Sequence, residues 1–115
     1  MHLGMSKKLA DSEGGRGISY SNKLKTKSGW TNEYSDQFAT NETGFSAVPE
    51  GYYGTYGLEF IRNVWNSTSN AYFWTSTKSP DSRQAWMRLI SDDHGKITRY
   101  DYRLHNGFSV RCIKD

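Results

Sequence analysis

A single cysteine, Cys112, is present in the 115 residues, and this count excludes a disulfide within the chain. Long apolar runs are also missing: none approaches the roughly 18 residues of a membrane-crossing helix. The first eight residues lack the apolar core of a signal peptide. Taken literally, these absences describe a cytoplasmic protein. A fragment that begins downstream of its own signal would have the same start.

Blocks of positive charge are scarce as well. The formal net charge is only +3, and the densest basic cluster is Lys23, Lys25 and Lys27, at alternating positions. Nucleic-acid binding depends on a concentrated basic face. Nucleic acid is therefore not an expected partner.

Aromatic residues are plentiful although hydrophobic residues in total are few. Hydrophobic residues make up 35% of the chain, yet aromatics alone reach 15%. Because each aromatic side chain buries a large area, a small core can be built from few of them. The length suits one folded domain over residues 1–115. The expected aromatic core consists of Trp30, Phe45, Trp74 and Phe108.

The order of patterns along the chain predicts one short helix, a long loop and a sheet. Ser6 is a good N-cap for a helix over 7–13, which the glycines at 14 and 15 would end. Residues 14–42 are polar and glycine-rich, which predicts an irregular loop region. Residues 71–115 predict an antiparallel strand meander, with strands at 71–77, 84–91 and 96–104 and a last strand carrying Phe108, Val110 and Cys112 on one face.

Four short motifs occur in order along the chain: GFSAVPEGY at 44–52, WTST at 74–77, AW at 85–86 and GFSVRC at 107–112. Together they resemble the Fibrobacter succinogenes major paralogous domain family. The resemblance implies an α+β fold similar to the C-type lectin fold, in the variant shared with formylglycine-generating enzymes. It also implies a bacterial surface or secreted protein, often associated with lipoprotein signals.

The resemblance further implies a missing segment. Members of the family usually begin earlier, with a segment like Cys-Pro-x-Gly-Trp, and that upstream cysteine would pair with the position of Cys112. We therefore expect an N-terminally truncated copy in which Cys112 is an orphaned half-disulfide. A buried small hydrophobe and a nucleophile are the alternatives. The enzymes that share the fold use a pair of cysteines, which argues against an enzyme here.

Metal and cofactor sites are not expected. The acids Glu33, Asp36 and Glu42 and the pair Asp92 and Asp93 could supply oxygen ligands for calcium. None of them lies in a calcium-binding motif, and Asp92-Asp93 is explained by turn chemistry before Gly95. Three scattered histidines and one cysteine do not form a zinc-ligand set.

Two groups of residues are candidates for ligand binding. Sugar rings stack on exposed aromatic side chains, for which the candidates are Tyr52, Tyr53, Tyr56, Trp65 and Trp86. Core and surface roles stay open for Tyr56 and Trp86. Charged residues on the outward phase of neighbouring strands form the second group, which would bind an acidic glycan or pair with one another across strands: Arg88, Arg99, Asp101, Arg103 and Arg111.

These observations favour a non-catalytic binding module that recognises glycan or protein through the loops at 31–42 and 52–70 and the sheet face. A structural module of an envelope protein and a hypervariable ligand-display domain are the alternatives. An enzyme is the least favoured, because no paired carboxylates, activated nucleophile or metal set stands out.

Overall fold

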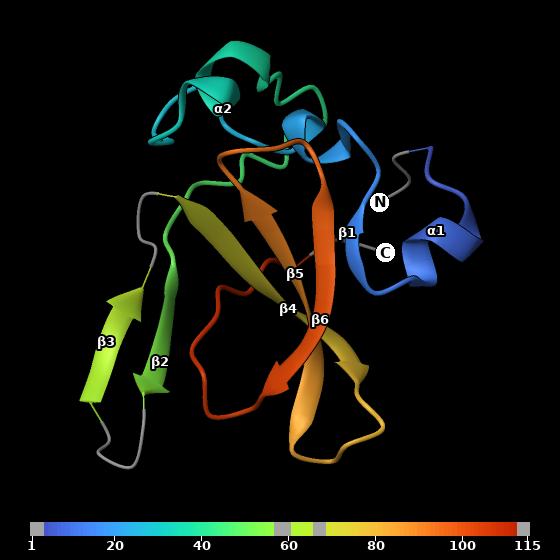
Figure 1. Ribbon diagram of the computed structural model, residues 1–115, viewed down its shortest axis with the longest axis vertical. Coiled ribbons are helices and arrows are strands. Elements are labelled where there is room, and N and C mark those ends of the chain that lie inside the picture. Colours follow the sequence, from blue (N-terminus) through green and yellow to red (C-terminus); the bar gives the residue numbers. More distant parts are fainter. Residues whose placement is uncertain (1–3, 57–60, 66–68, 113–115) are drawn as a thin grey trace.

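The computed structural model describes residues 4–56, 61–65 and 69–112. Its centre is a four-stranded antiparallel sheet in the order β1-β6-β5-β4 (Figure 1). The four strands are β1 (Gly14–Arg16), β4 (Asn70–Lys78), β5 (Gln84–Ser91) and β6 (Ile97–Arg103). With two short helices, this is an α+β domain, as the sequence predicted. No helix among these described residues is long and apolar enough to cross a membrane.

Alternation along the strands gives the sheet two faces. One face, which we call the first face, carries Phe73, Arg88 and Arg99, because Arg88 on β5 pairs with Phe73 on β4 and with Arg99 on β6. The pair of Ile90 and Ile97 lies on the same face, two residues further along. The second face carries the residues between them, among them Tyr72, Met87 and Tyr102. Each face has its own hydrophobic cluster, so the predicted single aromatic core is divided by the sheet.

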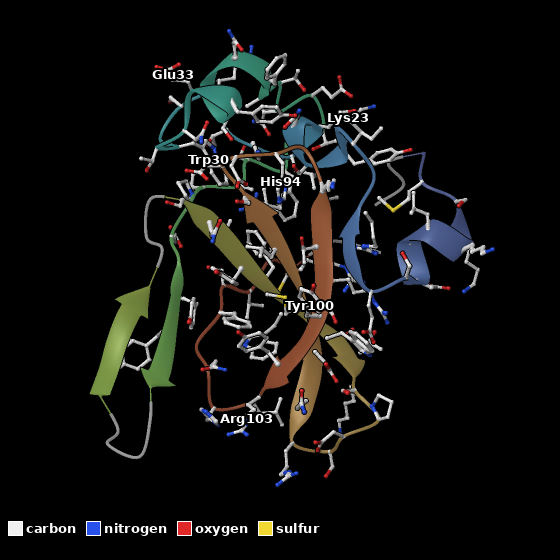
Figure 2. The ribbon with its side chains drawn as sticks, in the orientation of Figure 1. Lys23, Trp30, Glu33, His94, Tyr100 and Arg103 are labelled. Atoms are coloured by element: carbon white, nitrogen blue, oxygen red, sulfur yellow. The ribbon has the colours of Figure 1, made fainter. Side chains whose placement is uncertain are left out.

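The first cluster lies at one end of the first face. It joins Ile90 and Ile97 to Leu24, Trp30 and Ala47 from the region before the sheet. Figure 2 shows Trp30 and His94 together at this end, while Tyr100 and Arg103 lie further along β6. Phe45 packs against the same cluster.

The second cluster is built around Phe108. Its ring is stacked on Tyr72, at 5.3 Å between centroids, and lies 4.4 Å from the ring of Trp74. Tyr52 and Tyr102 complete the surroundings of Phe108. The segment after β6 therefore covers the second face.

The helix at the start is shorter than predicted. Helix α1 spans Lys7–Asp11, and Ser6 caps it by accepting a hydrogen bond from the Leu9 amide at 3.3 Å. The predicted irregular region 14–42 differs more: it contains β1, a 3-10 helix at Tyr20–Lys23 and helix α2 at Glu33–Phe38. Asn32 caps α2 through its side chain. Short elements of this kind have too few residues to show a period in the sequence.

The tyrosine-rich segment after residue 51 is a strand, not the loop that the sequence suggested. Strands β2 (Tyr52–Tyr56) and β3 (Ile61–Trp65) form a separate two-stranded sheet. In Figure 1 this sheet lies on the opposite side of the main sheet from α1. An isolated bridge joins Gly51, just before β2, to Ala71 on β4, and a second joins Tyr53 on β2 to Gly107 in the segment after β6.

The predicted last strand is not continuous within the described residues. Ser109 makes one parallel bridge with Phe73, on the edge of β4 that faces away from β5. Val110 is 72% exposed and Cys112 is exposed, whereas Phe108 is buried. Cys112 is therefore not the buried small hydrophobe of one sequence interpretation.

Candidate functional site

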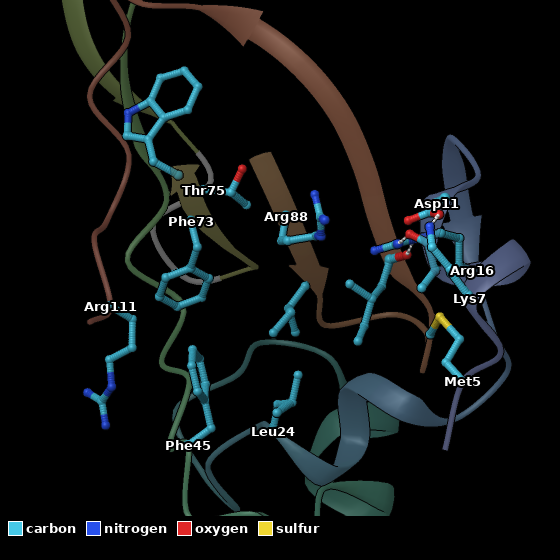
Figure 3. Close-up of a pocket in the computed structure, with 14 residues that line it drawn as sticks. Met5, Lys7, Asp11, Arg16, Leu24, Phe45, Phe73, Thr75, Arg88 and Arg111 are labelled. Atoms are coloured by element: carbon cyan, nitrogen blue, oxygen red, sulfur yellow. Dashed lines mark hydrogen bonds and ion pairs between the residues drawn. The ribbon is translucent and has the colours of Figure 1, made fainter. Parts of the chain in front are cut away.

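A pocket of about 700 Å³ opens on the first face. Core side chains from three parts of the chain form its floor, including Leu24, Phe73 and Ile90. Among the described residues that line the pocket, four are cations, Lys7, Arg16, Arg88 and Arg111, and one is an acid, Asp11. In Figure 3, Arg88, Arg16 and Lys7 lie on one side of this space, and Phe73, Phe45 and Arg111 lie on the other. The volume falls in the usual range for a ligand site.

Strand register gathers three arginines beside this pocket. Arg88 and Arg99 are direct partners across β5 and β6. Arg16 on β1 pairs with Ile97, two residues before Arg99, so all three lie on the first face. Like charges at directly opposite positions destabilise a sheet. The sequence predicted Arg88 and Arg99 on one face but did not single out Arg16, because its strand is only three residues long.

The arginines are positioned by backbone oxygens, not by carboxylates. Arg16 is 3% exposed, and its guanidinium donates to the carbonyl oxygens of Ile97, at 3.2 Å, and of Ala10. Arg99 Nη1 donates to the carbonyl of Asp11 at 2.7 Å. Arg88 makes one hydrogen bond, from Nη1 to the carbonyl of Met87 at 3.2 Å. Within the described part of the chain, none of the three has a carboxylate oxygen within 4.0 Å.

The pKa shifts agree with an uncompensated cluster of positive charge. Burial, and then the charges of Arg88 and Arg99, lower the pKa of Arg16 to about 10. Burial and the neighbouring Arg99 also lower the pKa of Arg88. Asp11 opposes both shifts, but its carboxylate is engaged by Lys7. With a pKa of about 10, Arg16 stays charged at neutral pH, and the arginine cluster would gain from a bound anion.

Trp86 is covered by one of these arginines. The guanidinium carbon of Arg99 lies 3.5 Å from the centroid of the Trp86 ring, and Trp86 is only 9% exposed. Such a stack is a cation–π contact. Trp86 therefore contacts Arg99 through its ring and, because it is buried, does not present a free ring face to a sugar.

Two of the other aromatic candidates, Tyr52 and Tyr53, are not among the residues that line the pocket. Tyr52 packs into the second cluster, 4.8 Å from the Tyr72 ring, whereas Tyr53 is 42% exposed. The backbones of Tyr56 and Trp65 pair within the small sheet, but their side chains lie outside the described residues. Tyr100 and Tyr102, which the sequence reasoning did not select, are more exposed than Tyr52.

The remaining charged candidates lie further along the first face. Asp101 pairs across the sheet with Trp86, and its carboxylate accepts a hydrogen bond from Ser79 Oγ at 2.5 Å. Arg103 is exposed at the end of β6, opposite Gln84. Of the predicted charged group, Arg88 and Arg111 line the pocket, whereas Arg99, Asp101 and Arg103 on β6 do not. Arg111 reaches the pocket from the segment after β6, with its guanidinium 5.4 Å from the Phe45 ring.

The described acids considered for calcium have separate surroundings, and the side chain of Asp36 lies outside the described residues. Glu42 pairs with Lys23 at 3.0 Å, and Asp93 accepts a hydrogen bond from Ser91 at 2.7 Å. Asp92 is buried, and Glu33 lies at the start of α2. In the part of the chain described above, no three His, Cys, Asp or Glu side chains are placed to hold a metal ion.

A second buried cation was also missed by the sequence reasoning. Lys25 is fully buried, and its Nζ donates to Ser35 Oγ and to the His94 carbonyl, both at 2.9 Å. Nζ also lies 5.3 Å from the centroid of the Trp30 ring. The cluster of Lys23, Lys25 and Lys27 is consequently not a basic surface.

Comparison with known proteins gives one result. Neither the curated proteins nor the solved structures contain a match. A family described as the Fibrobacter succinogenes major domain does match, over residues 1–114, which is nearly the whole chain. The motifs at 44–52, 74–77 and 107–112 had pointed to the same family. The chain belongs to the Fibrobacter succinogenes major domain family.

Proposed function

We propose that the chain is a non-catalytic binding module of a bacterial cell-surface or secreted protein. It would recognise a glycan or a protein through the first face, around the pocket between β1, β5 and the segment after β6. We also propose that its fold is similar to the C-type lectin fold. The observation that carries the proposal is the group of arginines, Arg16, Arg88 and Arg99, beside an open pocket and without carboxylate partners in the described residues.

Physical reasons favour recognition over a purely structural role for these arginines. Gathering like charges on a sheet face costs stability, and no hydrogen bond of Arg88 beyond its neighbouring carbonyl offsets that cost. Surface arginines that served solubility alone would be expected to alternate with acids. A bound anion would make charge-assisted hydrogen bonds to the free guanidinium donors.

A structural module is the second candidate, and the apolar pocket floor favours it. Side chains of the first cluster, such as Leu24 and Ile90, reach the pocket. A neighbouring domain of the same protein could cover them. In that case the pocket would be an interface, and free ligands would not compete for it.

The test is binding to an array of neutral and acidic glycans and to candidate partner proteins, with matched variants. Arg88→Met removes the charge beside the pocket and keeps an apolar stem. Arg103→Gln removes a charge from the same sheet face, away from the pocket. We expect at least one ligand to be retained by the wild type and by Arg103→Gln and to be lost by Arg88→Met. Equal retention by both variants would contradict the proposed site.

A further inference from the structure

The pocket has a lining that discriminates between classes of ligand. Its lining combines apolar side chains with hydrogen-bond donors, chiefly the guanidiniums of Arg16, Arg88 and Arg111. Hydrogen-bond acceptors are few. Those in the described lining are the Asp11 carboxylate, which binds Lys7 through one oxygen, and Thr75 Oγ1, which donates to the Trp86 carbonyl at 2.8 Å and keeps its lone pairs.

A neutral sugar matches this donor-rich lining less well than an anion does. Sugar hydroxyls both donate and accept hydrogen bonds, so a sugar site needs carboxylates or carbonyls as well as donors. A buried hydroxyl without an acceptor costs free energy. A carboxylate has the opposite character, because an ionised carboxylate only accepts and can take two hydrogen bonds from one guanidinium.

The two halves of the pocket are close enough for one small ligand to use both. Phe73, on β4, is the direct cross-strand neighbour of Arg88, and both line the pocket. An apolar group lying on Phe73 and Ile90 would therefore place an attached anionic group beside Arg88. Arg16, on the other side of β6, borders the same space (Figure 3).

We propose that the pocket binds an amphipathic monoanion, supplied by a protein partner as a hydrophobic residue that carries a free carboxylate. The apolar side chain lies on the floor, and the carboxylate accepts hydrogen bonds from Arg88 and Arg16. This inference rests on the proposed function and specifies its ligand. Arg99 contributes charge and holds the C-terminal end of α1 through the Asp11 carbonyl.

The first experiment uses two fluorescent probes that differ by one charge. Anilinonaphthalene sulfonate has an aromatic body and an anionic head, and phenylnaphthylamine has the same body without the head. We expect the wild type to bind the sulfonate at one saturable site, at least tenfold more tightly than the neutral probe. Arg88→Met should weaken sulfonate binding about tenfold, because a charge-assisted hydrogen bond is lost, and leave the neutral probe unchanged.

Two further variants separate the pocket from general electrostatics. Arg111→Gln, on the opposite rim, should weaken sulfonate binding by a smaller factor, about threefold, and Arg103→Gln should have no effect. A near-UV circular dichroism melt checks that each variant keeps cooperative packing, since the sulfonate also binds loosely packed states. Equal affinity for the two probes, or an equal effect of Arg103→Gln and Arg88→Met, would overturn the proposal.

Displacement then identifies the source of the anion. N-acetyltryptophan mimics a hydrophobic residue with a free carboxylate, N-acetyltryptophanamide lacks the charge, and trigalacturonate represents an acidic glycan. We expect displacement of the sulfonate by N-acetyltryptophan alone. Stronger displacement by trigalacturonate would refute the protein source. If binding of a ligand from the glycan and protein array depends on Arg88 while binding of the sulfonate does not, the ligand class inferred here is wrong. The proposed binding function would still stand.

Discussion

The buried amine of Lys25 gives a prediction whose size follows from the structure. Its side chain is 0% exposed, between Trp30 and Tyr34, and its Nζ is bound by Ser35 and the His94 carbonyl. Burial lowers the pKa of Lys25 from 10.5 to about 8, although the charges of Asp92 and Asp93 oppose the shift. In the unfolded chain the amine regains its ordinary pKa.

The sign of the pH dependence follows from proton counting. Between about pH 8 and pH 10.5 the unfolded chain keeps the Lys25 proton and the folded chain has released it. The free energy of unfolding therefore rises with pH across this window, at up to about 1.4 kcal/mol per pH unit. The whole window corresponds to about 3 kcal/mol. Below pH 8 both states are protonated, and the cost of burying the charge is fully present.

The perturbation is Lys25→Met, which keeps most of the stem and removes the titrating group. Urea unfolding of both proteins, followed by tryptophan fluorescence at several pH values from 7 to 10, gives the difference in free energy of unfolding. Subtraction cancels the tyrosines and the other lysines, which titrate in both proteins. We expect the wild type to gain about 2 kcal/mol or more on the variant between pH 7 and pH 10.

A matched control is available on the same segment. Lys27 is exposed, so Lys27→Met should change the free energy of unfolding by the same small amount at every pH. Parallel curves for the wild type and Lys25→Met would refute the reasoning, because they would mean that the Lys25 amine has the same pKa in the folded and unfolded chain.

Three further predictions concern stability and can be measured by urea unfolding at neutral pH. Phe108→Ala should lower the free energy of unfolding by about 3 to 5 kcal/mol, because the ring is the centre of the second cluster; a loss below 1 kcal/mol would contradict that role. Gly95→Ala should cost at least about 2 kcal/mol, since the new Cβ would lie 2.3 Å from the Ile18 carbonyl oxygen; no loss would show that the Ile18 segment can move away. Cys112→Ser should change stability by no more than about 0.5 kcal/mol, because the thiol is exposed, and a larger loss would point to a contact that the structure does not contain.

The sequence by itself determined the strands that are long enough to show a pattern. Residues in β5 and β6 alternate clearly, so the two-residue period assigned Arg88 and Arg99 to one face and Met87 to the other. The turn between these strands was predicted from its acids and glycine. Four motifs spread over the chain predicted the family, which the match over residues 1–114 confirmed.

Tertiary structure decided which contacts these residues make, because contacts between distant segments leave no local pattern in the sequence. Arg16 joins the arginine group only because a three-residue strand pairs with β6. Gly95 is required by the close approach of the segment around Ile18, not by a positive φ. The interior position of Lys25 depends on α2 and the turn after β5, which enclose it. The sequence left a surface and a core position equally open for Trp86. The residue is buried because Arg99 lies over its ring.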